Sequence, residues 1–168
     1  MRRHFTVTGF VSHDGRTALH WHKFGIWLPP GGHIEADEDP VQAMLREVRE
    51  ETGLEVVTVP SAPTFAYTSP PQLVPPVTIG VYDIANGDGS LAEAHQHIDF
   101  VYFTRLAGPA GDPARRTPPP ALPDDGMQWR WFTEDDVRSA DNLNDDVREL
   151  SLAAIRAVHT APSAPPGR

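Results

Sequence analysis

Short runs of hydrophobic and β-branched residues, separated by turn residues, recur along most of the chain. Residues 5–13 and 17–22 alternate loosely between apolar and polar side chains on either side of an Asp-Gly-Arg turn, which predicts a β-hairpin. Residues 24–32 form a short extended piece that prolines and glycines stop. The remaining runs predict strands at residues 54–59, 64–68, 77–84, 97–106 and 128–132.

Three other stretches have polar starts and the spacing of amphipathic helices. Asp39 and Pro40 predict an N-cap and a first helical residue, and Gly53 a left-handed end to a helix that runs to about Thr52. We expect this helix to bury Val41, Leu45 and Val48. Residues 133–140 and 144–158 predict two more helices, and the apolar face of the second consists of Val147, Leu150, Ala154 and Val158.

One helix among strands, with two helices at the end, predicts an α/β fold: an α/β/α sandwich around a central mixed β-sheet. The chain has 168 residues, enough for one domain with a core, and we place that domain at residues 1–159. Residues 107–126 contain many of the 18 prolines and predict a loop or lid; plain disorder is the alternative. Residues 160–168 predict a disordered tail.

Composition narrows the classes of function. The formal net charge is −9 and the pI is about 5.2, which argues against a nucleic acid polymer as partner. The chain has no cysteine and therefore no disulfide, thiolate metal site or cysteine nucleophile. No apolar run approaches the length of a membrane span, and the N-terminus lacks the pattern of a signal peptide, so we expect a cytoplasmic protein. A homodimer stays open.

Negative charge is concentrated in residues 32–54, which hold seven acids and two arginines, a net charge of −5. Helical spacing places Glu47, Glu50 and Glu51 on one face, so we expect their carboxylates to converge. Hard cations such as Mg²⁺ or Mn²⁺ suit such a face, although a solvated acidic helix would also explain it. The preceding Pro-Pro-Gly-Gly turn can present the Gly31 carbonyl as a further oxygen ligand.

The same stretch resembles the Nudix box, whose pattern is G-x5-E-x7-R-E-U-x-E-E-x-G-U, where U is aliphatic. Every specified position matches at the correct spacing: Gly32, Glu38, Arg46, Glu47, Val48, Glu50, Glu51, Gly53 and Leu54. The box covers about a seventh of the chain, and the order of strands and helices around it is similar to that of the Nudix fold.

The resemblance implies a Mg²⁺- or Mn²⁺-dependent hydrolase that cleaves the pyrophosphate of a nucleoside diphosphate linked to a group X, by attack of water on phosphorus. By position in the motif, Glu50 and Glu51 are expected metal ligands and Glu47 a ligand or the general base. The Gly31 carbonyl is a further expected ligand. Arg46 is expected to pair with a glutamate of the box and hold its orientation, and Glu38 to support the loop.

Residues outside the box add weaker candidates. Asp125 lies in a loop where relatives of the family often place a further acid, and an ordinary turn aspartate is the alternative. His95 and His97 are candidates for phosphate contact or proton transfer, and a strand-edge cluster without chemistry is the alternative. Other candidates for substrate binding, each of which an ordinary structural role would also explain, are Lys23, Trp27, Arg115 and Arg116.

The substrate itself stays open, because markers of the family's known subgroups mostly fail in this chain. Nucleoside triphosphates, oxidised nucleotides and compounds similar to ADP-ribose all fit the pattern. A domain of a different class, which binds a nucleotide as a sensor with little or no turnover, is the alternative. The complete set of box glutamates favours the enzyme, because binding alone does not require each of them.

Overall fold

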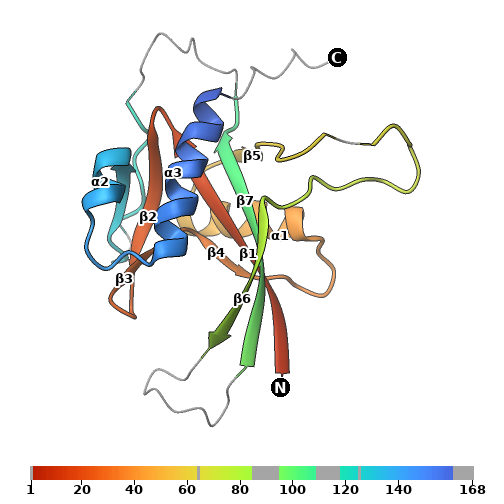
Figure 1. The fold of residues 1–168 in the computed structure, drawn as a ribbon, viewed down its shortest axis with the longest axis horizontal. Helices are drawn as coiled ribbons and strands as arrows, with labels where there is room; N and C mark the ends of the chain where they lie inside the picture. Colours follow the sequence, from red (N-terminus) through yellow and green to blue (C-terminus); the bar gives the residue numbers. More distant parts are fainter. Residues whose placement is uncertain (1, 64, 85–94, 109–117, 125, 161–168) are drawn as a thin grey trace.

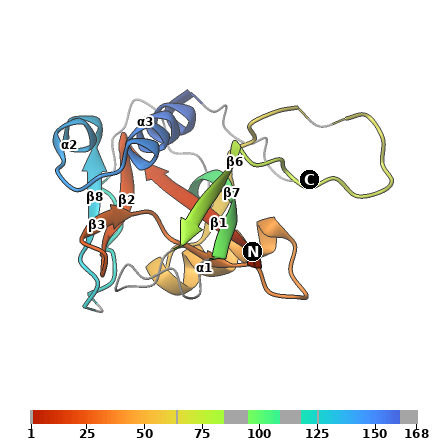
Figure 2. The same cartoon turned by 60° about the horizontal axis from the view of Figure 1, so that its bottom comes forward.

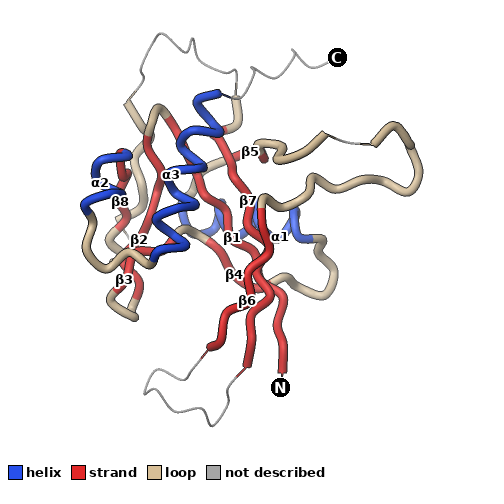
Figure 3. The backbone as a smooth tube through the Cα atoms, viewed as in Figure 1, coloured by secondary structure: helices blue, strands red, loops and turns tan. Residues whose placement is uncertain are grey.

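The strands form a single mixed sheet. The computed structural model describes residues 2–63, 65–84, 95–108, 118–124 and 126–160, and within them the sheet has eight strands (Figures 1 and 3). Their bounds are β1 (Arg2–His13), β2 (Arg16–His22), β3 (Ile26–Leu28), β4 (Gly31–His33), β5 (Val56–Thr58), β6 (Thr78–Ile84), β7 (His95–Leu106) and β8 (Trp129–Thr133).

The two longest strands, β1 and β7, run parallel side by side at the centre of this sheet (Figure 1). Their register pairs His4 with His97, Thr6 with Asp99 and Thr8 with Val101. The other pairings among the described strands are antiparallel: β2 and β4 flank β1, β5 and β6 flank β7, and β3 and β8 flank β2. The sheet is therefore mixed, as predicted.

Helices cover both faces of the sheet. One face packs against α1 (Pro40–Thr52) through a cluster that includes Val7, Val11, Met44 and Val48. The other face packs against α2 (Glu134–Ser139) and α3 (Asp145–Thr160). That second core includes Phe10, Leu19, Val101, Phe103, Phe132, Val137, Val147 and Ile155. Figure 2 shows α1 and α3 on opposite sides of the strands, which confirms the α/β/α sandwich.

Helix α1 begins and ends where the sequence predicts. Asp39 caps its first turn, accepting hydrogen bonds from the N–H groups of Val41 (2.8 Å) and Gln42 (2.9 Å). Gly53 ends it in the left-handed conformation with φ of 70°. The buried face differs from the prediction, because Leu45 is 36% exposed and Met44 takes its place in the core.

The approach of α1 to the sheet depends on a glycine in β1. A methyl group at Gly9 would lie 2.7 Å from Val48 Cγ2 and 3.1 Å from Met44 Sδ, closer than van der Waals contact allows. The contact with Gly9 therefore decides which residues of α1 are buried. Helical spacing along the sequence predicted Leu45, which is one position away from the buried residue, Met44.

The strand predicted at residues 64–68 is wrong for the part that is described. Residues 65–68 lie in an irregular loop that extends away from the body of the protein, with Phe65 74% exposed (Figures 1 and 2). Within the described part of the chain no strand pairs with them, and the Gln72 side chain satisfies their backbone groups instead. It accepts from the N–H of Phe65 and donates to the carbonyls of Phe65 and Tyr67.

Two predicted boundaries are also informative. Helix α3 continues through Thr160, so the predicted domain end at residue 159 falls within its last turn, and residues 161–168 lie outside the described residues. Of the predicted loop or lid, residues 118–124 are described: Leu122 packs with Trp131 against the core cluster on the α1 side, and the Trp131 indole donates to the Pro120 carbonyl at 2.9 Å. Within the described residues, no helix is long and apolar enough to span a membrane.

The cap of α1 can be tested directly. Replacing Asp39 by Ala removes the acceptor of two backbone N–H groups and should lower the free energy of unfolding by about 1 kcal/mol. Asp37→Ala is the matched control, because Asp37 is exposed in the same loop and its replacement removes the same charge. Urea denaturation of both variants measures the difference, and equal losses would show that charge, not capping, matters here.

Candidate active site

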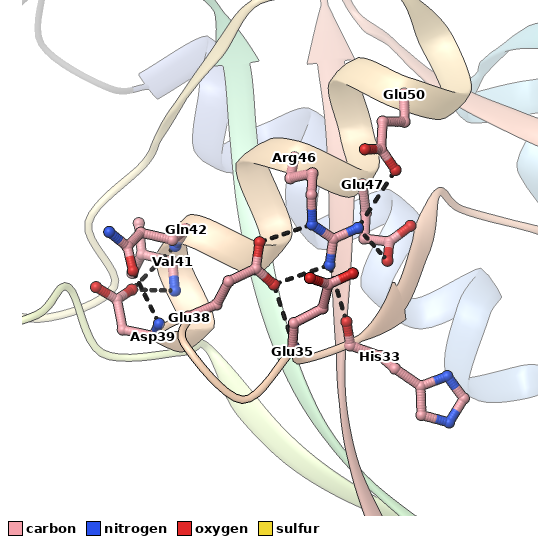
Figure 4. Close-up of polar contacts among 9 residues, drawn as sticks. All are labelled: His33, Glu35, Glu38, Asp39, Val41, Gln42, Arg46, Glu47 and Glu50. Atoms are coloured by element: carbon pink, nitrogen blue, oxygen red, sulfur yellow. Dashed lines mark hydrogen bonds and ion pairs between the residues drawn. The ribbon is translucent and has the colours of Figure 1, made fainter.

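Arg46 organises the polar edge of α1 (Figure 4). Its guanidinium holds Glu38 with two hydrogen bonds, from Nε to Oε1 at 2.6 Å and from Nη2 to Oε2 at 2.9 Å. The Nη1 atom also donates to Glu47 Oε1 at 2.8 Å and to Glu50 Oε2 at 3.3 Å. Nη2 donates to the His33 carbonyl at 3.0 Å, so one side chain ties α1 to β4 and to the loop between them.

These contacts leave Glu38 and Arg46 firmly ionised. The hydrogen bonds from Arg46 hold the pKa of the Glu38 carboxyl below its usual range. The hydrogen bonds from Arg46 to Glu38 and, to a smaller extent, to Glu47 raise the pKa of the Arg46 guanidinium well above its usual range. The Glu38 side chain is 15% exposed, so this pair lies in a setting that water screens only partly.

Two glycines let the carboxylates of α1 approach the β4 strand. A methyl group at Gly32 would overlap the Glu47 carboxylate, so that residue must lack a side chain. The N–H of Gly31 donates to Glu51 Oε2 at 3.1 Å. Gly31 lies opposite Thr8 in the antiparallel pairing of β4 with β1. Backbone hydrogen bonds join the strands on either side of this pair, from the Gly9 N–H to the Pro30 carbonyl and from the Ile34 N–H to the Phe5 carbonyl, so Gly31 occupies a position that is not hydrogen-bonded to β1. Its carbonyl is thus turned, with its N–H, away from β1.

The convergence of Glu47, Glu50 and Glu51 is less tight than the helical spacing suggested. Among the described residues, these three do not form a group whose ligand oxygens all lie within 4.8 Å of one another. The reason is that Arg46 lies between Glu47 and Glu50, while the Gly31 N–H holds Glu51. The Glu50 side chain is 61% exposed and thus has room to change rotamer.

The donor chemistry fits a hard divalent cation. Carboxylate oxygens of Glu47, Glu50 and Glu51 and the outward-turned carbonyl of Gly31 surround the junction of α1 and β4. The space beside the Gly32 backbone holds the Glu47 carboxylate, and a side chain at position 32 would displace it. Oxygen donors of this kind suit Mg²⁺ or Mn²⁺ and do not favour a thiophilic metal.

A cavity of about 680 Å³ opens beside this junction, on the face of the sheet that α3 covers. Alternating residues of β1 and β7 form part of its wall, because side chains two apart on a strand share a face. The start of α3 closes one side through Asn144 and Asp146. Gly31, Gly32 and Glu51 also line the cavity, which places two of the predicted metal ligands, Gly31 and Glu51, at its edge.

Asp99 is a buried acid in the wall of this cavity. It is 6% exposed and accepts a hydrogen bond from the Thr6 hydroxyl at 2.8 Å. Burial raises the pKa of its carboxyl, and hydrogen bonds from Thr6 and Thr8 partly oppose that rise. A buried carboxylate that faces a cavity is in a position to accept a proton from a molecule bound there.

Four histidines gather at the end of the cavity nearest the N-terminus. His4 Nδ1 lies 3.2 Å from His33 Nε2, and His95 Nε2 lies 3.2 Å from His97 Nε2. The rings of His4 and His95 have centroids 4.6 Å apart. Burial, followed by the charges of His33, His95 and His4, lowers the pKa of His97 to about 4. Burial likewise lowers the pKa of His4.

The structure supports the remaining predicted substrate residues unequally. Lys23 and His97 line the cavity, and His95 lies against His97 just behind it. Trp27 instead packs between Trp21 and Phe132 and, within the described part of the chain, is not among the lining residues, so its stacking on a base gains no support. Arg115, Arg116 and Asp125 lie outside the described residues, and their roles stay predictions.

Sequence reasoning missed His4 and His33, and it considered Asp99 only together with His95 and His97 on the same strand. His4 has no other histidine near it in β1, and its proximity to His97 arises from a parallel pairing with a strand 93 residues along the chain. A lone histidine carries no local signal of its partners. The spacing of two residues between His95, His97 and Asp99 was the one available clue, because it places three polar side chains on one face of a strand.

Comparisons with known proteins agree with this architecture. The NUDIX domain profile matches residues 2–153, and the chain therefore belongs to the NUDIX family. A solved NUDIX-family hydrolase from Clostridium perfringens is 26% identical, with a TM-score of 0.66 over 93% of this chain and 98% of that one.

Curated relatives match a shorter region. The 8-oxo-dGTP diphosphatase of Proteus vulgaris is 43% identical over 49 residues, which are 29% of this chain and 44% of that protein. The m7GpppN-mRNA hydrolase NUDT17 of Xenopus laevis is 53% identical over 34 residues, which are 20% of this chain and 12% of that protein. The chain thus spans less than half the length of these relatives.

The histidine cluster predicts a pH dependence of stability. The folded protein holds His97 neutral down to about pH 4, whereas in the unfolded chain it takes up a proton near its ordinary pKa of 6.5. Folding stability should therefore fall as the pH falls through this window. The groups that face His97 are His4, His33 and His95.

His97→Asn should reduce this loss, measured as the free energy of unfolding between about pH 7 and about pH 4.5 in the presence of a chelator. His159→Asn is the control, because His159 is exposed near the end of α3. An unchanged pH profile in the His97 variant would show that other groups cause the acid sensitivity.

Proposed function

We propose that this protein is a divalent-metal-dependent pyrophosphohydrolase that cleaves a nucleoside diphosphate linked to a group X. The observation that carries the proposal is the junction of α1 and β4, where Arg46 orients Glu47 and Glu50 and where Glu51, held by the Gly31 N–H, lines a cavity of about 680 Å³. Membership of the NUDIX family and relatives named as diphosphatase and pyrophosphohydrolase support it.

The residues that would hold the cation are Glu47, Glu50, Glu51 and the Gly31 carbonyl. When bound, a divalent ion neutralises pyrophosphate oxygens and lowers the pKa of water. Arg46 is a positioning residue: it restrains Glu47 and Glu50 through Nη1, while its paired contact with Glu38 fixes the guanidinium itself. The Gly31 N–H restrains Glu51 in the same way.

Three groups are candidates to accept the proton of the attacking water. Glu47 is the first candidate by its place in the motif. Asp99 is a second, because it faces the cavity and burial raises its pKa. Asp125, predicted from sequence, is a third, and Asp125→Asn would lower kcat with little change in Tm if it contributes.

Lys23 and His97 would contact the phosphate groups of the substrate. Both line the cavity, and Lys23 is an exposed cation at its mouth. Arg115 and Arg116, in the predicted loop or lid, would add positive charge over the substrate. A small nucleotide is the favoured substrate class, because a chain with a net charge of −9 offers little attraction to a polyanionic nucleic acid.

A nucleotide-binding sensor with little turnover is the alternative function. It requires the cavity but not the full set of box glutamates, and the chain retains each of them in contact with Arg46 or Gly31. Phosphate release over a panel of nucleoside triphosphates and ADP-ribose-like compounds, with and without Mg²⁺ or Mn²⁺, separates the two. Metal-dependent release supports the enzyme, whereas binding without release supports the sensor.

Glu50→Gln tests the metal assignment. The change keeps the shape of the side chain but removes one negative charge from the proposed metal site, and it should lower kcat at least about a hundredfold. Glu55→Gln is the matched control, because Glu55 pairs with Arg49 on the exposed side of the same helix end. Parental activity of Glu50→Gln at saturating metal would remove Glu50 from the metal site.

Arg46→Lys tests whether the guanidinium fork positions the glutamates. Lysine keeps the charge but cannot hold Glu38 with two parallel hydrogen bonds and reach Glu47 as well. Mn²⁺ affinity, measured by electron paramagnetic resonance, should fall about 10- to 100-fold. Arg49→Lys, on an exposed arginine three residues along α1, should leave it unchanged. Equal Mn²⁺ affinity in the Arg46 variant would show that its charge alone suffices.

A further inference from the structure

The histidine cluster lies where three strands meet. His4 comes from β1, His33 from β4 and His97 from β7. The parallel register sets His4 directly opposite His97, and the β4 pairing sets His33 opposite Thr6, two residues along β1 from His4. The ligand nitrogens of these three side chains all lie within 4.8 Å of one another. The backbone of three strands therefore fixes their positions.

The spacing resembles that of nitrogen ligands around a metal ion. With Zn–N bonds of about 2.0–2.1 Å, two ligands of a tetrahedral ion lie about 3.3 Å apart. His4 Nδ1 and His33 Nε2 are separated by 3.2 Å, which matches one edge of such a tetrahedron. Small side-chain rotations would bring the His97 nitrogen from its position within 4.8 Å to the same spacing.

Hydrogen bonding between the rings explains this arrangement only in part. A single N–H shared between His4 and His33 satisfies one nitrogen of each, but His4 Nε2 is buried and has no hydrogen-bond partner among the described residues. A buried polar atom without a partner is costly. Several imidazoles packed with nitrogens toward one another are an arrangement in which histidine binds metals.

We propose that His4, His33 and His97 form a second metal site, for a first-row transition-metal ion such as Zn²⁺. Imidazole nitrogen favours Zn²⁺, Ni²⁺ and Cu²⁺ over Mg²⁺, so this site differs in chemistry from the carboxylates of α1. His33 and His97 also line the cavity. Three protein ligands leave a fourth position for water or an anion, and that position would face the cavity. His95 lies against His97 and supports the ring from behind.

Cobalt binding to the purified full chain tests the site without reference to activity. Tetrahedral Co²⁺ with nitrogen ligands has strong visible absorption, whereas six-coordinate Co²⁺ on oxygen ligands absorbs weakly. We expect a visible band that saturates at about one ion per chain, and that Zn²⁺ but not excess Mg²⁺ removes it. His97→Gln should abolish the band and weaken Zn²⁺ competition at least about a hundredfold, beyond the range of outer-shell effects.

His33→Gln provides a second variant with little risk to folding, because His33 is exposed, and it should also lose the band. Two controls should keep it: His159→Gln, at an exposed histidine of α3, and Glu51→Gln, in the carboxylate site. The proposal is overturned if the parent shows no band, if both His33 and His97 variants retain it, or if Glu51→Gln abolishes it. Because Glu51→Gln disables only the proposed hydrolytic centre, the two proposals fail separately.

Discussion

The parallel pairing of β1 with β7 is the constraint on which the rest of this structure depends. It joins the first strand to one about 90 residues later, over eleven consecutive residue pairs. On one face it presents Val7 and Val11 to α1, and on the other it aligns His4 and Thr6 with His97 and Asp99. Core and cavity are therefore two faces of one strand pair, and any shift in register by one residue would exchange them.

Close approach of α1 to the sheet is the second requirement, and it is met at glycines. Gly9 admits Met44 and Val48, and Gly32 admits the Glu47 carboxylate. Arg46 then counteracts the repulsion of the acids that this approach brings together, because it contacts three glutamates and a β4 carbonyl. The result is a set of oxygen donors at one edge of the cavity and a set of imidazoles at its end, which suit different cations.

Most of the fold could be predicted because its signals are local. Strand and helix boundaries followed from alternation, turn residues and capping side chains, and the cap at Asp39 and the left-handed end at Gly53 are where the sequence places them. The failures have a common physical cause. Residues 65–68 have the composition of a strand but no neighbour to pair with, and Leu45 has the spacing of a core residue but lies beyond the contact of α1 with Gly9.

The candidate site, like the fold, has a part that local sequence signals predict and a part that they do not. The box glutamates, Arg46 and the preceding glycines lie within 23 residues, so the sequence by itself determined that several carboxylates would lie on one helix next to a glycine turn. The tertiary structure alone decided that Asp99 would be buried in the cavity wall and that His4 would meet His33 and His97. Those contacts depend on the register between strands distant in sequence, and that register is set by packing over the whole sheet, which no local pattern encodes.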